Sequence, residues 1–144
     1  MKLLSIKAFM IAAFSLVAGT TQAQVEVRSL DQVLSPEAIA TDFQPQQRLS
    51  YYFGIVDINS YNSARWIVTN RGTTPLSYIS SYISGIDFRA SHNCYSGLMP
   101  NQQCDFSINY WPAFEGYDSG WFEIGFSENN LISVDVWGEA RRRW

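Results

Sequence analysis

The sequence predicts an all-β domain built as a sandwich of about seven short strands. Aromatic residues make up 15% of the chain and charged residues 16%, a balance that favours strands over helices. Short runs in which apolar and polar residues alternate are separated by turns rich in Gly, Asn and Pro. Strands of this length at this regular spacing are typical of two sheets packed face to face.

The first 23 residues have the pattern of a secretory signal peptide. Lys2 and Lys7 supply a positive start, and residues 8–18 form an apolar run. Thr21 and Ala23 place small residues at the −3 and −1 positions of a cleavage site. The alternative is a membrane anchor, but the run falls well short of the roughly 20 residues that span a bilayer. We therefore expect a periplasmic or secreted protein with no membrane span.

The chain that follows the leader is acidic. Both lysines would leave with the leader, so that eight arginines remain against thirteen acidic residues, a net charge near −5. A general nucleic-acid binder needs clustered positive charge to displace counterions. The only such cluster is the C-terminal tail, 141–144, which could dock an acidic groove or fray as a terminus. The sequence therefore argues against nucleic acid as a partner.

Residues 24–47 differ from the rest and predict a short N-terminal extension. Residues 29–34 suggest a helical turn, and Ser35 and Pro36 suit the N-cap and first position of another. We expect the extension to pack against the domain or to dock a partner. The sandwich itself is expected at 48–140.

Alternating apolar residues mark the expected strands and the faces that point into the core. Strands are predicted at 49–55, 64–69, 76–83, around Phe88, 106–110, 122–126 and 132–136. Because side chains alternate along a strand, the inward rows are Ala64, Trp66 and Val68; Phe106, Ile108 and Tyr110; Phe122, Ile124 and Phe126; and Ile132, Val134 and Val136. Turns are predicted at 57–62, 70–72, 84–85, 115–120 and 127–130, and Gly138 is expected to end the last strand.

A set of residues in one order and spacing covers about 49–140. Its members are Phe53-Gly54, Trp66, Asn70-Arg71-Gly72, Pro75-Leu76, Gly85 to Phe88, Cys94, Leu98, Pro100, Cys104, Phe106, Ile108, Tyr110, Pro112, Gly116 and Gly138. The pattern resembles the immunoglobulin-like modules called ASH or hydin-like domains, and especially their bacterial secreted relatives of the choice-of-anchor D type. The resemblance implies an immunoglobulin-like β-sandwich of about seven strands, usually non-catalytic, that serves as a structural, adhesive or docking module.

The two cysteines predict a disulfide. Export permits the bond, and Cys94 and Cys104 can pair in only one way. The chain-entropy model assigns roughly 3 kcal/mol to a loop of this size. A Cys94–His92 nucleophile is the alternative, and the bond would remove its thiolate. The cysteines and the single histidine lack metal-site spacing, so we expect neither metal nor cofactor.

Catalytic motifs are absent from the sequence. It contains no nucleophile elbow, phosphate loop or dinucleotide turn. Glu115 and Asp118 could in principle act as a glycosidase pair, but acidic residues in a Gly-flanked turn are usually only solvated. We therefore expect that the protein is not an enzyme.

The final predicted hairpin supplies the candidate partner surface. If its turn is centred between Glu128 and Asn130, then Trp121 faces Trp137 and Glu123 faces Asp135 on the outside of one sheet. Like charges directly opposite are destabilising, so an arginine from a neighbouring strand or a partner should neutralise them. Clustered exposed aromatic residues mark interaction sites, and Trp111 is outward by the same alternation.

This surface could also be hidden or misplaced. The N-terminal extension could cover it, or a one-residue slip of register would exchange the two faces of the strand.

The sequence as a whole predicts an exported, non-catalytic interaction or structural module, a component of or adaptor for a bacterial envelope or surface assembly with a protein partner. The alternative is a carbohydrate-binding domain that stacks sugars on Trp111, Trp121 or Trp137. A hydrolase with a dispersed carboxylate site is the third possibility.

Overall fold

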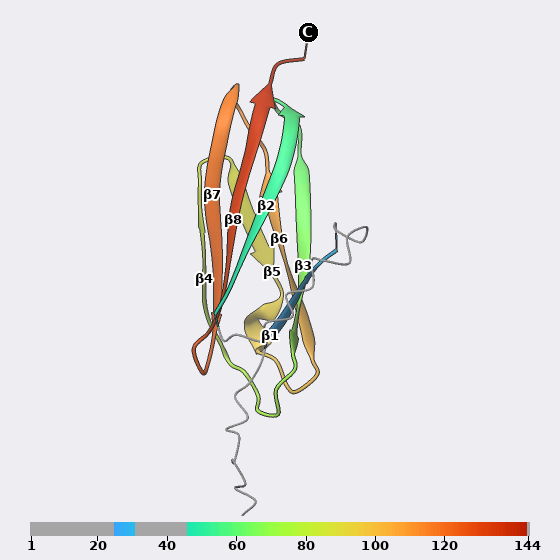
Figure 1. The fold of residues 1–144 in the computed structure, drawn as a ribbon, viewed down its shortest axis with the longest axis vertical. Coiled ribbons are helices and arrows are strands. Elements are labelled where there is room, and N and C mark those ends of the chain that lie inside the picture. The colour runs from blue at the N-terminus through green and yellow to red at the C-terminus, as the bar shows by residue number, and fades with distance from the viewer. Residues whose placement is uncertain (1–24, 31–45, 144) are drawn as a thin grey trace, which may run out of the picture.

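The computed structural model describes residues 25–30 and 46–143, and these residues form a sandwich of two four-stranded sheets (Figure 1). The strands are β1 (Val25–Ser29), β2 (Gln46–Asp57), β3 (Asn62–Asn70), β4 (Tyr78–Ser84), β5 (Phe88–His92), β6 (Gln103–Tyr110), β7 (Gly116–Phe126) and β8 (Asn130–Arg141). A single 3₁₀ turn, η2 (Cys94–Ser96), lies between β5 and β6 in this part of the chain. The predicted all-β sandwich is confirmed.

The first sheet has the strand order β1-β3-β6-β5 and the second has the order β2-β8-β7-β4. All neighbouring strands are antiparallel except β2 and β8, which run parallel. In Figure 1 the long strands β2, β8 and β7 lie side by side as one layer. The parallel pair joins β2, the second strand along the chain, to β8, the last one. Local sequence patterns do not reveal this pairing.

The core lies between the sheets and contains the predicted inward rows. Every member of the four predicted rows is at most 3% exposed, and so is Phe88. Trp66 stacks on Phe106 with ring centroids 5.1 Å apart, and Phe106 contacts Phe122 of the second sheet at 4.9 Å. The tilted contact between Phe106 and Phe122 thus joins the two layers.

Two predicted strand limits in the C-terminal half are wrong. Residues 115–120, expected to form a turn, mostly belong to β7, which begins at Gly116. The last strand does not end at Gly138 but continues to Arg141. The reason is pairing: Gly116 is opposite Ala140 and Gly120 is opposite Val136, so each strand supplies the partner that extends the other. Gly120 is needed there, because an added Cβ would lie 2.2 Å from the carbonyl oxygen of Ser84.

Part of the predicted N-terminal extension is a strand of the first sheet. Residues Val25–Ser29 form β1 and pair antiparallel with β3, from Val25 opposite Asn70 to Ser29 opposite Trp66. Val25 and Val27 are buried, which explains why this short segment joins the sheet. β2 already starts at Gln46. The leader 1–23 and most of the predicted helical turns lie outside the described residues.

The register of the final hairpin differs from the predicted register by two residues. Its turn is centred on Glu128, with Phe126 opposite Asn130. Glu128 and Asn129 both have φ of 59°, and the Asn130 side chain donates to the Ser127 carbonyl oxygen at 2.9 Å. This left-handed pair starts β8 earlier than expected. A shift of two keeps the same residues on each face, so the predicted outward residues stay outward.

The described residues contain no helix long and apolar enough to cross a membrane.

Candidate functional site

The outer face of the second sheet carries aromatic side chains from all four of its strands. Tyr52 of β2 stacks on Trp137 of β8, with ring centroids 6.0 Å apart and planes at 21°. Trp121 of β7 contacts Tyr82 of β4 at 5.0 Å and 42°. Tyr52, Tyr82 and Trp121 are exposed, and Trp137 is half-buried. We call these four residues the aromatic face.

A recess of about 280 Å³ opens on this face beside Trp121. The side chain of Ser133 is small, and the larger side chains around it extend further from the sheet, so that a recess remains above Ser133. Two carboxylates and one guanidinium are set around it. The residues that line it are Arg48, Trp121, Glu123, Ser133 and Asp135.

The charges of the recess are only partly paired within the described chain. Arg48 Nε donates to Asp135 Oδ2 at 2.8 Å, and this hydrogen bond raises the pKa of Arg48 above its ordinary value. Glu123 accepts a hydrogen bond from the Ser133 hydroxyl at 3.2 Å. Among residues 25–30 and 46–143, Glu123 forms no ion pair. The recess therefore keeps a net charge of about −1.

The residues predicted to lie directly opposite each other are diagonal neighbours in the structure. Trp121 lies opposite Asp135 and Glu123 lies opposite Ser133, so neither the two tryptophans nor the two acids face each other directly. The arginine expected from a neighbouring strand is Arg48, since β2 lies beside β8. The structure thus brings together four of the five predicted surface residues: Trp121, Glu123, Asp135 and Trp137.

Trp111, the fifth predicted residue, lies elsewhere. It follows β6, which belongs to the first sheet, and it is 58% exposed. Its ring contacts Tyr61 edge-on with centroids 6.5 Å apart. Its backbone N–H donates to the carbonyl oxygen of Asp87 at 2.9 Å. Trp111 is therefore not part of the aromatic face.

Besides Ser133 of the hairpin, three residues that β2 and β4 bring to this site were not predicted: Arg48, Tyr52 and Tyr82. Alternation along β2 places Arg48 and Tyr52 on one side, and alternation along β4 does the same for Tyr82. The sequence therefore contains the signal for their outward direction. It lacks the signal for their neighbours, because β2 and β4 are joined to this hairpin only by sheet topology.

The outer face of the first sheet has a contrasting, polar depression of about 440 Å³. The hydroxyls of Ser91 and Ser107 are 2.8 Å apart. Arg65 forms an ion pair with Asp105. The other residues that line the polar depression are Ser63, His92, Asn93 and Phe106. Its charged side chains are thus paired with each other.

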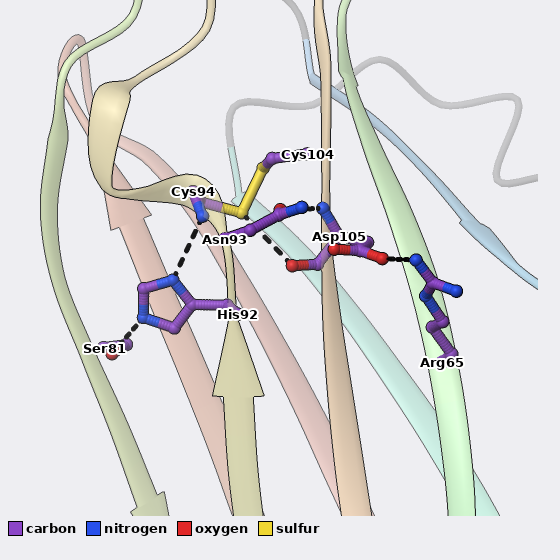
Figure 2. Close-up of a disulfide and its surroundings, with 7 residues drawn as sticks. All are labelled: Arg65, Ser81, His92, Asn93, Cys94, Cys104 and Asp105. Carbon is purple, nitrogen blue, oxygen red and sulfur yellow. Dashed lines mark hydrogen bonds and ion pairs between the residues drawn. A yellow bond between two sulfur atoms is a disulfide. The ribbon is translucent and has the colours of Figure 1, made fainter.

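The disulfide lies at the end of this polar side (Figure 2). Cys94 and Cys104 are bonded, as predicted, with Cα atoms 5.1 Å apart. Asn93 Oδ1 accepts the backbone N–H of Asp105 at 2.7 Å, which ties the loop to β6. The bond consumes the thiol that a Cys–His nucleophile would need.

His92 is hydrogen-bonded in a way that does not suit a catalytic base. Its Nδ1 accepts the backbone N–H of Cys94 at 3.3 Å, and its Nε2 lies 2.9 Å from Ser81 Oγ (Figure 2). With Nδ1 as acceptor, the neutral ring carries its proton on Nε2 and donates to Ser81. A base that activates serine must do the reverse. Burial lowers the pKa of His92.

The basic C-terminal residues are engaged with the chain itself. Arg141 is the last residue of β8 and not part of a tail. The three arginines form ion pairs with one acidic residue each: Arg141 with Glu139, Arg142 with Glu115 and Arg143 with Asp57. Glu115 is thus an ion-pair partner in the structure. Residues 25–30 and 46–143 contain no group of three potential metal ligands.

The edge strand β4 adjoins the aromatic face and lacks charge. The sheet edges in the described chain are β1, β5, β2 and β4. β1, β5 and β2 each contain an arginine, whereas β4 reads YISSYIS. Ile79 and Tyr82 of β4 are 64% and 58% exposed. Charges on edge strands discourage pairing with other chains, so β4 is the edge best suited to such pairing.

Comparisons with known proteins support the fold. No family model and no curated protein matches the chain. Among solved structures, the ASH/PapD-like domain 7 of human CEP192 matches over 99% of this chain and 100% of that domain, with a TM-score of 0.56 and 14% identity. A Porphyromonas gingivalis protein of unknown function matches over 87% of this chain and 51% of that one, with a TM-score of 0.54 and 14% identity.

Two enzymes contain a part with the same architecture. A family 123 glycoside hydrolase from Clostridium perfringens (TM-score 0.54, 11% identity) and the VesB protease of Vibrio cholerae (0.53, 17%) each match 65% of this chain. The chain spans only 23% and 30% of their lengths. At these identities the likenesses show an immunoglobulin-like sandwich and no activity. The finer assignment to the choice-of-anchor D type stays a prediction.

Proposed function

We propose that this protein is an exported, non-catalytic interaction module, a component of or adaptor for a bacterial envelope or surface assembly. The observation that carries the proposal is the aromatic face, which continues without interruption into the uncharged edge strand β4 through Tyr82. Large aromatic side chains gathered on one exposed face are typical of protein-binding surfaces. The disulfide and the predicted leader agree with function outside the cytoplasm.

Recognition by this module combines two elements. The face offers rings that a partner can cover, and the open edge offers backbone N–H and C=O groups to a partner strand. The two β-sheets are joined by a closely packed aromatic core, so the surface is held in place before it binds. A preformed surface loses little conformational entropy on binding.

Site-specific crosslinking in the native envelope tests the proposal. A photoreactive residue at position 133, in the recess, should give a discrete adduct with an envelope protein, and the same residue at position 107, on the polar face, should not. Trp121→Ala combined with Trp137→Ala should abolish the adduct, whereas Trp111→Ala should leave it unchanged. The proposal is wrong if position 133 gives no adduct, or if the double substitution leaves the adduct intact.

A further inference from the structure

We infer that the recess on the aromatic face binds an arginine or lysine side chain from a basic segment of the partner protein. The inference rests on the proposed function, because it takes the aromatic face as the recognition surface. It goes further in naming the chemistry of the group that enters. Its starting point is the charge imbalance of the recess, in which Arg48 is paired with Asp135 and Glu123 is left with a hydroxyl.

The shape and the walls of the recess suit a cationic side chain. Trp121 forms one wall and Glu123 lies on the same strand two residues away. A guanidinium or ammonium group is attracted to the face of a tryptophan ring, and a carboxylate at the same place accepts its N–H donors. A neutral sugar could stack on Trp121, but it would leave the net charge of the recess uncompensated.

No arginine of the described residues pairs with Glu123. Described arginines other than Arg48 are engaged elsewhere: Arg28 and Arg71 with Glu26, Arg65 with Asp105, Arg89 with backbone carbonyl oxygens, and the C-terminal three with their own acids. The stretch 31–45 holds Asp31, Glu37 and Asp42 and neither arginine nor lysine. Both lysines of the chain, Lys2 and Lys7, lie in the predicted leader and would leave with it, so we expect the complementary charge to come from another molecule.

The polar depression provides an internal comparison. It is larger and also holds a carboxylate, Asp105, but Arg65 pairs with that carboxylate and no tryptophan lines the depression. A basic segment should therefore distinguish the two faces of the sandwich. The acidic charge of the chain would also attract such a partner from a distance, an effect that salt weakens.

Titration of the exported full-length protein with short peptides tests the inference. The probe is acetyl-Ser-Arg-Ser-Arg-Ser-amide, and the control replaces each arginine by citrulline, which has nearly the same shape and no charge. The readout is the indole N–H resonance of each tryptophan in an isotope-labelled sample. We expect the Trp121 resonance to move with the arginine peptide only, the Trp111 resonance to stay, and the response to weaken as salt is raised.

Matched variants locate the charge that matters. Glu123→Gln should weaken binding by about five-fold or more, an effect of the size expected for the loss of a close charge pair. Glu139→Gln, on the same face but paired with Arg141, should change binding by less than about two-fold. Both variants should keep the melting temperature of the parent, which separates loss of binding from loss of fold.

Four results would overturn the inference: an immobile Trp121 resonance at millimolar arginine peptide, equal binding of the citrulline peptide, unchanged binding by Glu123→Gln, or a Trp121 shift caused by a chito-oligosaccharide in place of the peptide. The crosslinking experiment separates this failure from failure of the proposed function. If the position 133 adduct forms while the peptide is silent, only the cationic ligand is wrong. If the adduct is also missing, the interaction surface itself is wrong.

Discussion

The two outer faces of the sandwich differ in how completely their charged groups are satisfied. On the first sheet, Arg65 and Asp105 form an ion pair and the neighbouring serine hydroxyls bond to each other. On the second sheet, the Glu123 carboxylate lacks a cation in the described chain, and Trp121 beside it belongs to a face with rings from four strands. The smaller depression is therefore the candidate site, because it holds a carboxylate without a cation partner.

The largest expected effect on stability comes from the Cys94–Cys104 disulfide on the polar side. Replacing Cys94 and Cys104 by alanine should lower the free energy of unfolding by roughly 3 kcal/mol, because the open loop regains entropy in the unfolded chain. Denaturant unfolding under oxidising conditions measures this loss. The aromatic face is supported by other strands, so arginine-peptide binding by the folded variant should be retained. Loss of both properties together would show that the two faces are not independent.

Removing one arginine from each face sharpens the comparison. Arg48→Ala frees Asp135, makes the recess more negative, and should tighten arginine-peptide binding roughly three-fold. Arg65→Ala frees Asp105 on the polar side and should lower stability by about 1 kcal/mol. It should not create a peptide site, because no tryptophan lines the polar depression. Peptide titration and thermal unfolding of both variants measure these effects. Peptide binding to the Arg65→Ala polar face would mean that charge alone is sufficient.

The smallest expected effect is a pH dependence of stability that belongs to the polar side. His92 is the single histidine of the chain, and burial lowers its pKa in the fold. The unfolded chain therefore takes up this proton more readily. The stabilisation is present above the ordinary pKa of about 6.5 and is lost as pH falls through the lower pKa of the folded state.

A His92→Gln variant isolates this contribution. The parent should lose stability between neutral and mildly acidic pH more steeply than the variant, as measured by unfolding at a series of pH values. Protonation of Nδ1 would also break the hydrogen bond from Cys94. Parallel curves for the two proteins would mean that His92 does not contribute to the pH dependence.

Local patterns in the sequence were sufficient to predict the layers of the fold. The inward rows, Phe88 in the core and the disulfide are all as expected, because alternation along a strand and the pairing of two lone cysteines are local or unambiguous. The errors arose where strands depend on partners. Residues 116–120 have turn-like composition but form a strand since β8 lies beside them, and Val25–Ser29 forms a strand since β3 offers an edge.

Composition and alternation along the chain predict the class of fold, the two faces of each strand and the outward direction of Trp121, Glu123, Asp135 and Trp137. Which of these residues meet depends on how the strands pair in the sheets. Strand pairing sets the register of the hairpin two residues from the predicted one and places Trp111 away from the aromatic face. It also brings Arg48, Tyr52 and Tyr82 beside the hairpin. The physical reason is that the direction of a side chain follows from its own backbone, whereas its neighbours follow from how distant strands pair.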